Sequence, residues 1–208
     1  MNADGPSSTE RQLRLLRWVI ALNVLATVIE IFGFCQTFSL AVVVNVVMGL
    51  VDASALGLNY YGRRLEEKNG QRKAKEDRAK KIAHYSNLAI GAICLAPMIS
   101  AAYRLYVNQT TGEVLPFNGT LIMLVAGLGL LCDGISLKIY PEQNGNESSP
   151  NIRSGKIKVI NGVVSCGTSF ITGAIIWRFG FHWLDSVAAI GVGGFILWLL
   201  WDEFRNNH

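Results

Sequence analysis

Long apolar blocks, separated by short polar segments, dominate the pattern of hydrophobic and polar positions along this chain. Residues 39–52, for example, contain no proline and no charge before Asp52. Blocks of roughly 20 residues can cross a bilayer as helices, because an α-helix rises about 1.5 Å per residue. The pattern therefore predicts an all-α integral membrane protein with six transmembrane helices. The six predicted spans are Arg17–Phe38, Leu40–Tyr60, Tyr85–Val107, Leu121–Tyr140, Val159–Trp177 and Trp183–Trp201.

Lysine and arginine are distributed unequally between the two sides of these six spans. One side carries 17 of the 19 basic residues, and only Arg104 and Arg178 fall on the other. Because cytoplasmic loops carry the excess of Lys and Arg, we expect both termini to be cytoplasmic. The expected location is the plasma (inner) membrane, with the lipid bilayer as the main partner.

The polar segments divide the chain into a tail, a membrane domain and two internal connections. Residues 1–14 are expected to form a disordered cytoplasmic tail, and residues 15–208 a six-span transmembrane domain. Residues 141–150 form a polar, breaker-rich linker. Residues 63–81 are basic but interleaved with acids, which favours a solvated cytoplasmic extension of the second span or contact with anionic lipid over nucleic-acid binding.

Histidine and cysteine positions argue against an enzyme. The three histidines, His84, His182 and His208, lie near span ends or the terminus, and no nucleophile and base pair is apparent. The four cysteines occur singly in four spans, where a free thiol usually packs as a small apolar side chain. Cys132 and Cys166 are also candidate ligands for a soft metal.

Polar residues form a stripe on two of the predicted spans. In the second span, Asn45, Asp52 and Asn59 recur every seven residues, with Met48 between the first two. Such residues face the bundle interior or a wet cavity, because hydrocarbon cannot satisfy them and a buried charge costs a few kcal/mol. For the Ser and Thr positions, helix packing is an equal alternative. The stripe of the fifth span comprises Lys158, Asn161, Ser165, Thr168 and Thr172.

Several short motifs follow one another in a distinctive order. Ser39-Leu40-Ala41 precedes Asn45 and Asp52, Asp133 lies three residues before Ser136, Asn151-Ile152-Arg153 opens the fifth span, and Trp183-Leu184-Asp185 opens the sixth. In the first span, Leu22-Asn23 is followed by Glu30 and Gly33. In order and spacing these landmarks resemble the six-span fold of the cation diffusion facilitator family, across nearly the whole chain. The family's usual C-terminal cytoplasmic domain is expected to be missing, because only residues 202–208 follow the last span.

The resemblance implies a metal site, but one whose ligands are altered. The family builds a tetrahedral zinc site from two pairs of residues spaced four apart, which share a helix face. In this chain those positions carry Met48, Asp52, Lys158 and Gly162, so only Asp52 matches. Its carboxylate either pairs with the ammonium of Lys158 or stays protonated or bonded to Asn45 while Lys158 extends to the cytoplasmic interface.

A second possible site uses other oxygen atoms. Glu30, Asn45, Asp52 and Asp133 could bind a harder ion such as manganese or magnesium. The alternative reading of Glu30 and Asp133 is that they serve as partners of buried hydroxyl or amide groups.

Two functions follow from the resemblance. The first is a membrane carrier that exports a divalent cation, zinc or manganese, from the cytoplasm through a site around Asp52. The second is a transport-inactive relative that acts as an accessory or regulatory subunit of another membrane protein. The resemblance also implies a dimer, either of two copies or with a second membrane subunit.

Overall fold

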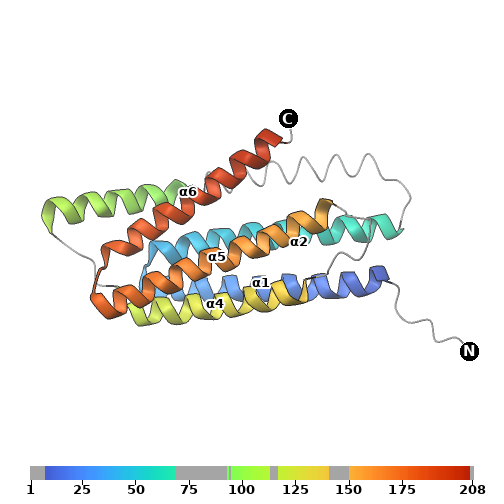
Figure 1. Cartoon of the computed structure of the whole chain (residues 1–208), viewed down its shortest axis with the longest axis horizontal. Coiled ribbons are helices and arrows are strands. Elements are labelled where there is room, and N and C mark those ends of the chain that lie inside the picture. The colour runs from blue at the N-terminus through green and yellow to red at the C-terminus, as the bar shows by residue number, and fades with distance from the viewer. Residues whose placement is uncertain (1–7, 69–92, 94, 113–116, 141–149, 207–208) are drawn as a thin grey trace, which may run out of the picture.

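A computed structural model describes residues 8–68, 93, 95–112, 117–140 and 150–206 of the chain. Within them every regular element is helical (Figure 1). The helices are α1 (Ser8–Thr37), α2 (Leu40–Lys68), α4 (Gly119–Ile139), α5 (Pro150–Phe179), α6 (Trp183–Asn206) and an unlabelled helical segment at 95–111. The described residues thus confirm an all-α fold with six helices.

Three of the described helices are long enough and apolar enough to cross a membrane. They are Arg11–Thr37 within α1, Gly119–Ile139, and Val159–Phe179 within α5. Leu40–Ser54 and Trp183–Trp198 are shorter apolar helices. Many large apolar side chains on the outside of the bundle are exposed, as expected of a surface that faces lipid.

Some helix ends differ from those predicted from the sequence. α1 already begins at Ser8, so residues 8–14 are helical where a disordered tail was expected. The physical reason is that Leu13 and Leu16 are buried and continue the inward face of this helix. α5 begins at Pro150, within the predicted linker, and the third helix continues past Val107 to residue 111. Residues 1–7, 69–81 and 141–149 lie outside the described residues, as does 85–92 of the third predicted span.

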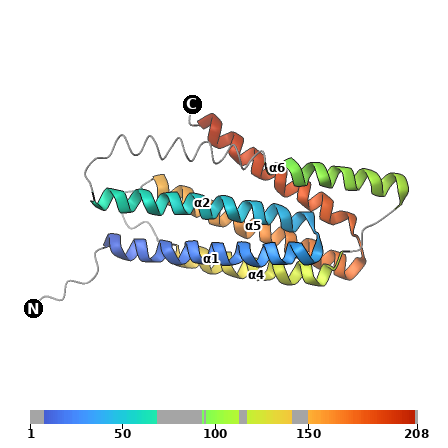
Figure 2. The ribbon, with the colours of Figure 1, turned by 180° about the vertical axis from the view of Figure 1, so that it is seen from behind.

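Four helices form the central bundle, and two pack against one side of it. α1, α2, α4 and α5 run alongside one another, whereas α6 and the 95–111 segment lie together beyond α2 and α5 (Figures 1 and 2). A cluster of buried apolar side chains joins this outer pair to α2. Its members are Leu40, Val44, Val47, Met48, Ala101, Ala189, Val192 and Ile196.

Glycines bring α4 and α5 into backbone contact. A Cβ atom added to Gly173 would lie 2.7 Å from the backbone nitrogen of Met123, and one added to Gly119 would lie 2.5 Å from that of Trp177. Small residues at such crossings allow membrane helices to pack closely. α4 and α5 therefore form a tightly joined pair.

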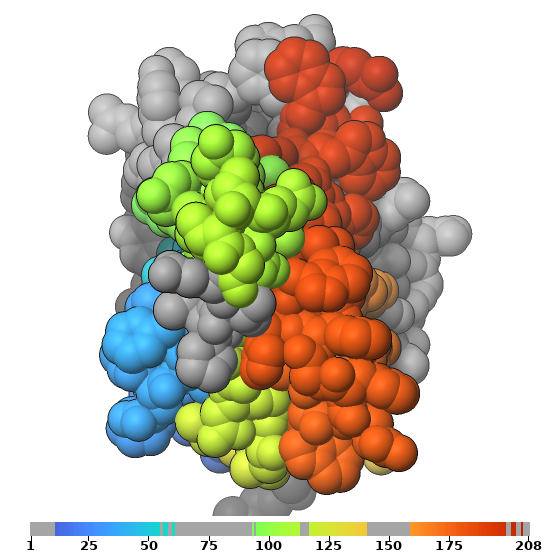
Figure 3. Space-filling model, turned by 90° about the vertical axis from the view of Figure 1, so that its left-hand side faces the viewer, coloured from blue at the N-terminus to red at the C-terminus, as the bar shows by residue number. Residues whose placement is uncertain are grey.

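The turn between α1 and α2 positions the polar face of α2. Phe38 adopts the left-handed conformation with φ of 52°, and its carbonyl oxygen accepts a hydrogen bond from Arg104 at 3.1 Å. Asp185, at the beginning of α6, accepts hydrogen bonds from the Ser39 hydroxyl and from the backbone nitrogen of Leu40, the latter at 2.8 Å. Figure 3 shows this end of the molecule, where the 95–111 segment and the ends of α1, α4, α5 and α6 gather.

Candidate functional site

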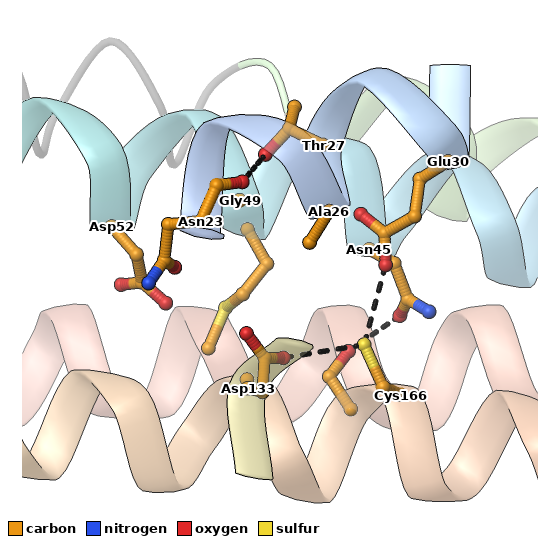
Figure 4. Close-up of a pocket in the computed structure, with 12 residues that line it drawn as sticks. Asn23, Ala26, Thr27, Glu30, Asn45, Gly49, Asp52, Asp133 and Cys166 are labelled. Atoms are coloured by element: carbon orange, nitrogen blue, oxygen red, sulfur yellow. Dashed lines mark hydrogen bonds between the residues drawn. The ribbon is translucent and has the colours of Figure 1, made fainter. Parts of the chain in front are cut away.

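A small polar pocket lies inside the bundle between α1, α2, α4 and α5 (Figure 4). The space left between its side chains is about the size of one water molecule. Carboxylate, amide, thiol and thioether groups from all four helices contribute to its wall. The lining residues are Asn23, Ala26, Thr27, Glu30, Asn45, Met48, Gly49, Asp52, Asp133, Gly162, Ser165 and Cys166.

Helical periodicity explains why these residues meet. The lining residues of α1 begin at Asn23 and follow at the third, fourth and seventh positions after it, and those of α2 repeat this spacing from Asn45. Residues at these intervals lie on one helix face. A Cβ atom on Gly49 would collide with the Thr27 hydroxyl, so the glycine allows α1 and α2 to approach at the pocket.

Asn45 links α2 to α5. Its side-chain oxygen accepts a hydrogen bond from the Ser165 hydroxyl at 2.5 Å, and its nitrogen donates one to the Ser169 hydroxyl at 3.0 Å. All three residues are buried. The amide of Asn45 therefore spans the gap between two helices and orients the polar face of α2 toward α5.

Cys166 connects two carboxylates from two other helices. Its sulfur lies 3.2 Å from Oε1 of Glu30 on α1 and 3.5 Å from Oδ2 of Asp133 on α4 (Figure 4). Glu30 and Cys166 are each 3% exposed and Asp133 is 5% exposed. A thiol of α5 thus lies between two buried acids of α1 and α4, and its single hydrogen can be donated to one of them at a time.

Two glycines make room for this group. A Cβ atom on Gly162 would lie 2.8 Å from Oδ2 of Asp133. One on Gly129 would lie 3.1 Å from both Oε1 of Glu30 and the sulfur of Cys166. The carboxylates therefore occupy space that a side chain at either position would fill.

Asp52 and Met48 form the α2 wall of the same pocket. Asp52 is 3% exposed, and in Figure 4 it lies at the end of the pocket opposite Glu30. Its side chain faces the bundle interior and shares the pocket with Gly162 and Ser165 of α5. Lys158 is part of α5, but its side chain lies outside the described residues, so its pairing with Asp52 stays a prediction.

Two acidic side chains, Glu30 of α1 and Asp133 of α4, lie close together at the pocket. Among the described side chains, neither Glu30 nor Asp133 forms an ion pair. Among the described residues, no group of three or more Asp, Glu, Cys or His side chains could hold a metal ion. Buried carboxylates without a countercharge are costly, and a cation or protons would relieve that cost.

Asn45, Met48, Asp52, Glu30 and Asp133, the candidate ligands from the sequence, all line the pocket. Cys166, for which packing and a soft-metal role were the alternatives, lines it too. On α5, the buried polar face consists of Ser165, Ser169 and Thr172, whereas Asn161 and Thr168 are only half-buried. The sequence feature that could have placed Cys166 in the pocket is its position four residues after Gly162, which puts both residues on the same helix face.

Comparison with known proteins identifies relatives over almost the whole chain. A family model described as the cation efflux transmembrane domain matches residues 16–208. The chain is 28% identical over 206 residues to the metal cation efflux system protein CzcD of Cupriavidus metallidurans, and equally to the cation efflux system protein CzcD of Alcaligenes sp.. These alignments cover 98% of this chain but 62% of each relative, so the chain spans about six-tenths of their length.

Proposed function

This chain belongs to the cation efflux family of membrane proteins, and from that premise we propose that it carries a divalent metal cation across the membrane through the pocket between α1, α2, α4 and α5. The transported ion is the substrate, with zinc and manganese as the leading candidates. Transport, rather than catalysis, is the activity to which the family points.

One observation carries the proposal. The pocket collects three buried carboxylates, from Glu30, Asp52 and Asp133, on three helices of one bundle. Asp133 lies about 21 Å along the axis of α4 from Gly119, well inside a hydrocarbon core of about 30 Å. Ionisable groups at such depth are expensive and mark ion pathways in membrane proteins.

Each pocket group has a role in this proposal. Asp52 is the α2 ligand, and Met48 on the same face offers a thioether. Glu30 and Asp133 supply further oxygen atoms. Asn45 acts through position, because its amide bonds to Ser165 and Ser169 of α5.

The direction and setting of transport follow from the charge distribution. The 17 basic residues on one side of the spans favour cytoplasmic termini and export from the cytoplasm across a plasma (inner) membrane. In this role the chain forms a dimer, either of two copies or with another membrane subunit.

A second function is favoured by the altered ligand positions. Met48 and Gly162 line the pocket, yet a thioether and a bare backbone are weak substitutes for the family's usual ligands. A chain that kept the fold but lost transport would serve as an accessory or regulatory subunit of another membrane protein.

Flux measurements separate the two functions. The purified chain is reconstituted in vesicles, and zinc, manganese and cobalt fluxes are followed under an imposed proton gradient. We expect flux that Asp52→Asn abolishes and that the matched surface variant Asp202→Asn leaves unchanged. Absence of flux for every ion, from a folded protein, contradicts the carrier and supports the accessory role.

A further inference from the structure

We propose that His182, in the turn between α5 and α6, forms a pH-sensitive contact: its neutral imidazole holds the residue that precedes α4, and protonation releases it. The contact lies at the end of the bundle that holds the turns between α1 and α2 and between α5 and α6 (Figure 3). This inference goes beyond the proposed function, because no step in it involves a transported ion.

The hydrogen bond between Phe117 and His182 fixes the protonation state of the imidazole. The backbone nitrogen of Phe117 donates to Nδ1 of His182 at 3.2 Å. A backbone N–H group can only donate, so Nδ1 must offer a lone pair and the neutral ring carries its hydrogen on Nε2. When the ring takes up a proton from solvent, both nitrogens become donors. Two N–H groups then face each other, and the hydrogen bond is lost.

The charged side chains around this contact favour its release in acid. The guanidinium carbon of Arg104 lies 5.5 Å from the centroid of the Phe117 ring, and the His182 ring lies 6.2 Å from the same centroid. Protonation therefore places a second positive charge near Arg104. Asp185 of α6 is bonded to the beginning of α2, and Arg178 of α5 lies over the ring of the next residue. No acid in the described part of the chain forms an ion pair with His182.

Phe117 connects this contact to the apolar layer above the pocket. Its ring packs against a buried apolar cluster, and the next residue, Asn118, caps α4. Along α2, α4 and α5, the cluster lies between this end of the bundle and the pocket residues. Release of Phe117 should therefore loosen the layer that separates the pocket from this end. The cluster comprises Val42, Ile122, Val125 and Ile176.

The test measures hydrogen exchange at the Phe117 amide of the full chain in lipid nanodiscs, by NMR of protein labelled with ¹⁵N-phenylalanine. The quantity compared is the protection factor, which corrects for the intrinsic pH dependence of exchange. Because imidazole changes charge between about pH 5 and pH 8, wild-type protection should fall about fivefold from pH 7.5 to pH 5.5, as expected when one hydrogen bond is lost.

Three histidine variants assign the effect to one side chain. His182→Ala should give low protection at both pH values, whereas His182→Asn, whose side-chain oxygen accepts a hydrogen bond without titrating, should keep protection at both. His208→Ala, at the last residue of the chain, is the matched control and should behave as the wild type.

Two results would overturn the inference: equal wild-type protection at the two pH values, or a pH dependence that persists in His182→Asn. Should His182→Ala not fold, His182→Asn carries the test alone. The measurement uses no metal, so failure of transport leaves its result unaffected, and its own failure leaves the proposed carrier standing.

Discussion

The carboxylate of Asp185 accepts a hydrogen bond from the hydroxyl of Ser39, a residue 146 positions earlier in the chain. It also accepts bonds from the backbone nitrogens of Leu40 at 2.8 Å and Ala41 at 3.4 Å. A negative group at the beginning of a helix satisfies free N–H groups and suits the helix dipole. The side chain of Asp185 in α6 thereby holds the beginning of α2, the helix that carries Asn45 and Asp52.

Replacing this carboxylate should destabilise the bundle. Asp185→Ala removes bonds to a buried hydroxyl and two backbone donors, at a cost of about 2 kcal/mol. Thermal unfolding in detergent measures the loss. Asp202→Ala, at the surface end of the same helix, is the control and should unfold at nearly the wild-type temperature, because exposed ion pairs contribute little. Equal melting temperatures for the two variants would refute the capping role.

Gly162→Ala should disturb the pocket through Asp133. The new methyl group would lie 2.8 Å from the Asp133 carboxylate, which must move, at a cost of about 1 to 3 kcal/mol. We expect reduced metal flux from a protein that still folds. Gly167→Ala, on the same helix but with open space around its Cβ position, should transport normally. Equal flux from both variants would show that the position of Asp133 is unimportant for transport.

Asn45 and Ser165 should be energetically coupled. Their buried hydrogen bond of 2.5 Å joins α2 to α5, and bonds between membrane helices contribute about 0.6 kcal/mol on average and up to about 1.7. A double-mutant cycle with Asn45→Ala and Ser165→Ala, followed by unfolding in detergent, measures the coupling. Thr168→Ala in place of Ser165→Ala is the control, because the Thr168 hydroxyl donates to Val164 of its own helix. Additive effects in the first cycle would contradict the link.

Lys158→Ala tests whether the Lys158 side chain pairs with Asp52. Removing one partner of a buried pair leaves an uncompensated charge and costs about 3 kcal/mol or more. The melting temperature should therefore fall, and adding Asp52→Asn should restore part of the loss. Lys138→Ala, at an exposed position near the end of α4, should have little effect. An unchanged melting temperature for Lys158→Ala would favour a lysine that extends to the membrane interface.

The helices and the polar face of α2 that lines the pocket could be predicted from the sequence. Apolar block length predicts membrane helices, and the spacing of Asn45, Met48 and Asp52 predicts one polar face. The roles of Cys166 and Gly162 could not be predicted in the same way. A cysteine in an apolar span has the properties of a packing residue, and the position of Gly162 in the sequence does not show that it leaves room for Asp133. Both roles depend on how neighbouring helices are aligned, which no single helix pattern encodes.

The glycine contacts between α4 and α5 restrict how an ion could pass. Because Gly119 and Gly173 bring the two backbones together, separating α4 from α5 would break this close packing. Asp133 and Cys166 thus belong to the closely packed pair α4 and α5, and Glu30 contacts Cys166 from α1. A displacement of α1 relative to α4 and α5 would part Glu30 from Cys166 and leave the contact between Asp133 and Cys166 in place.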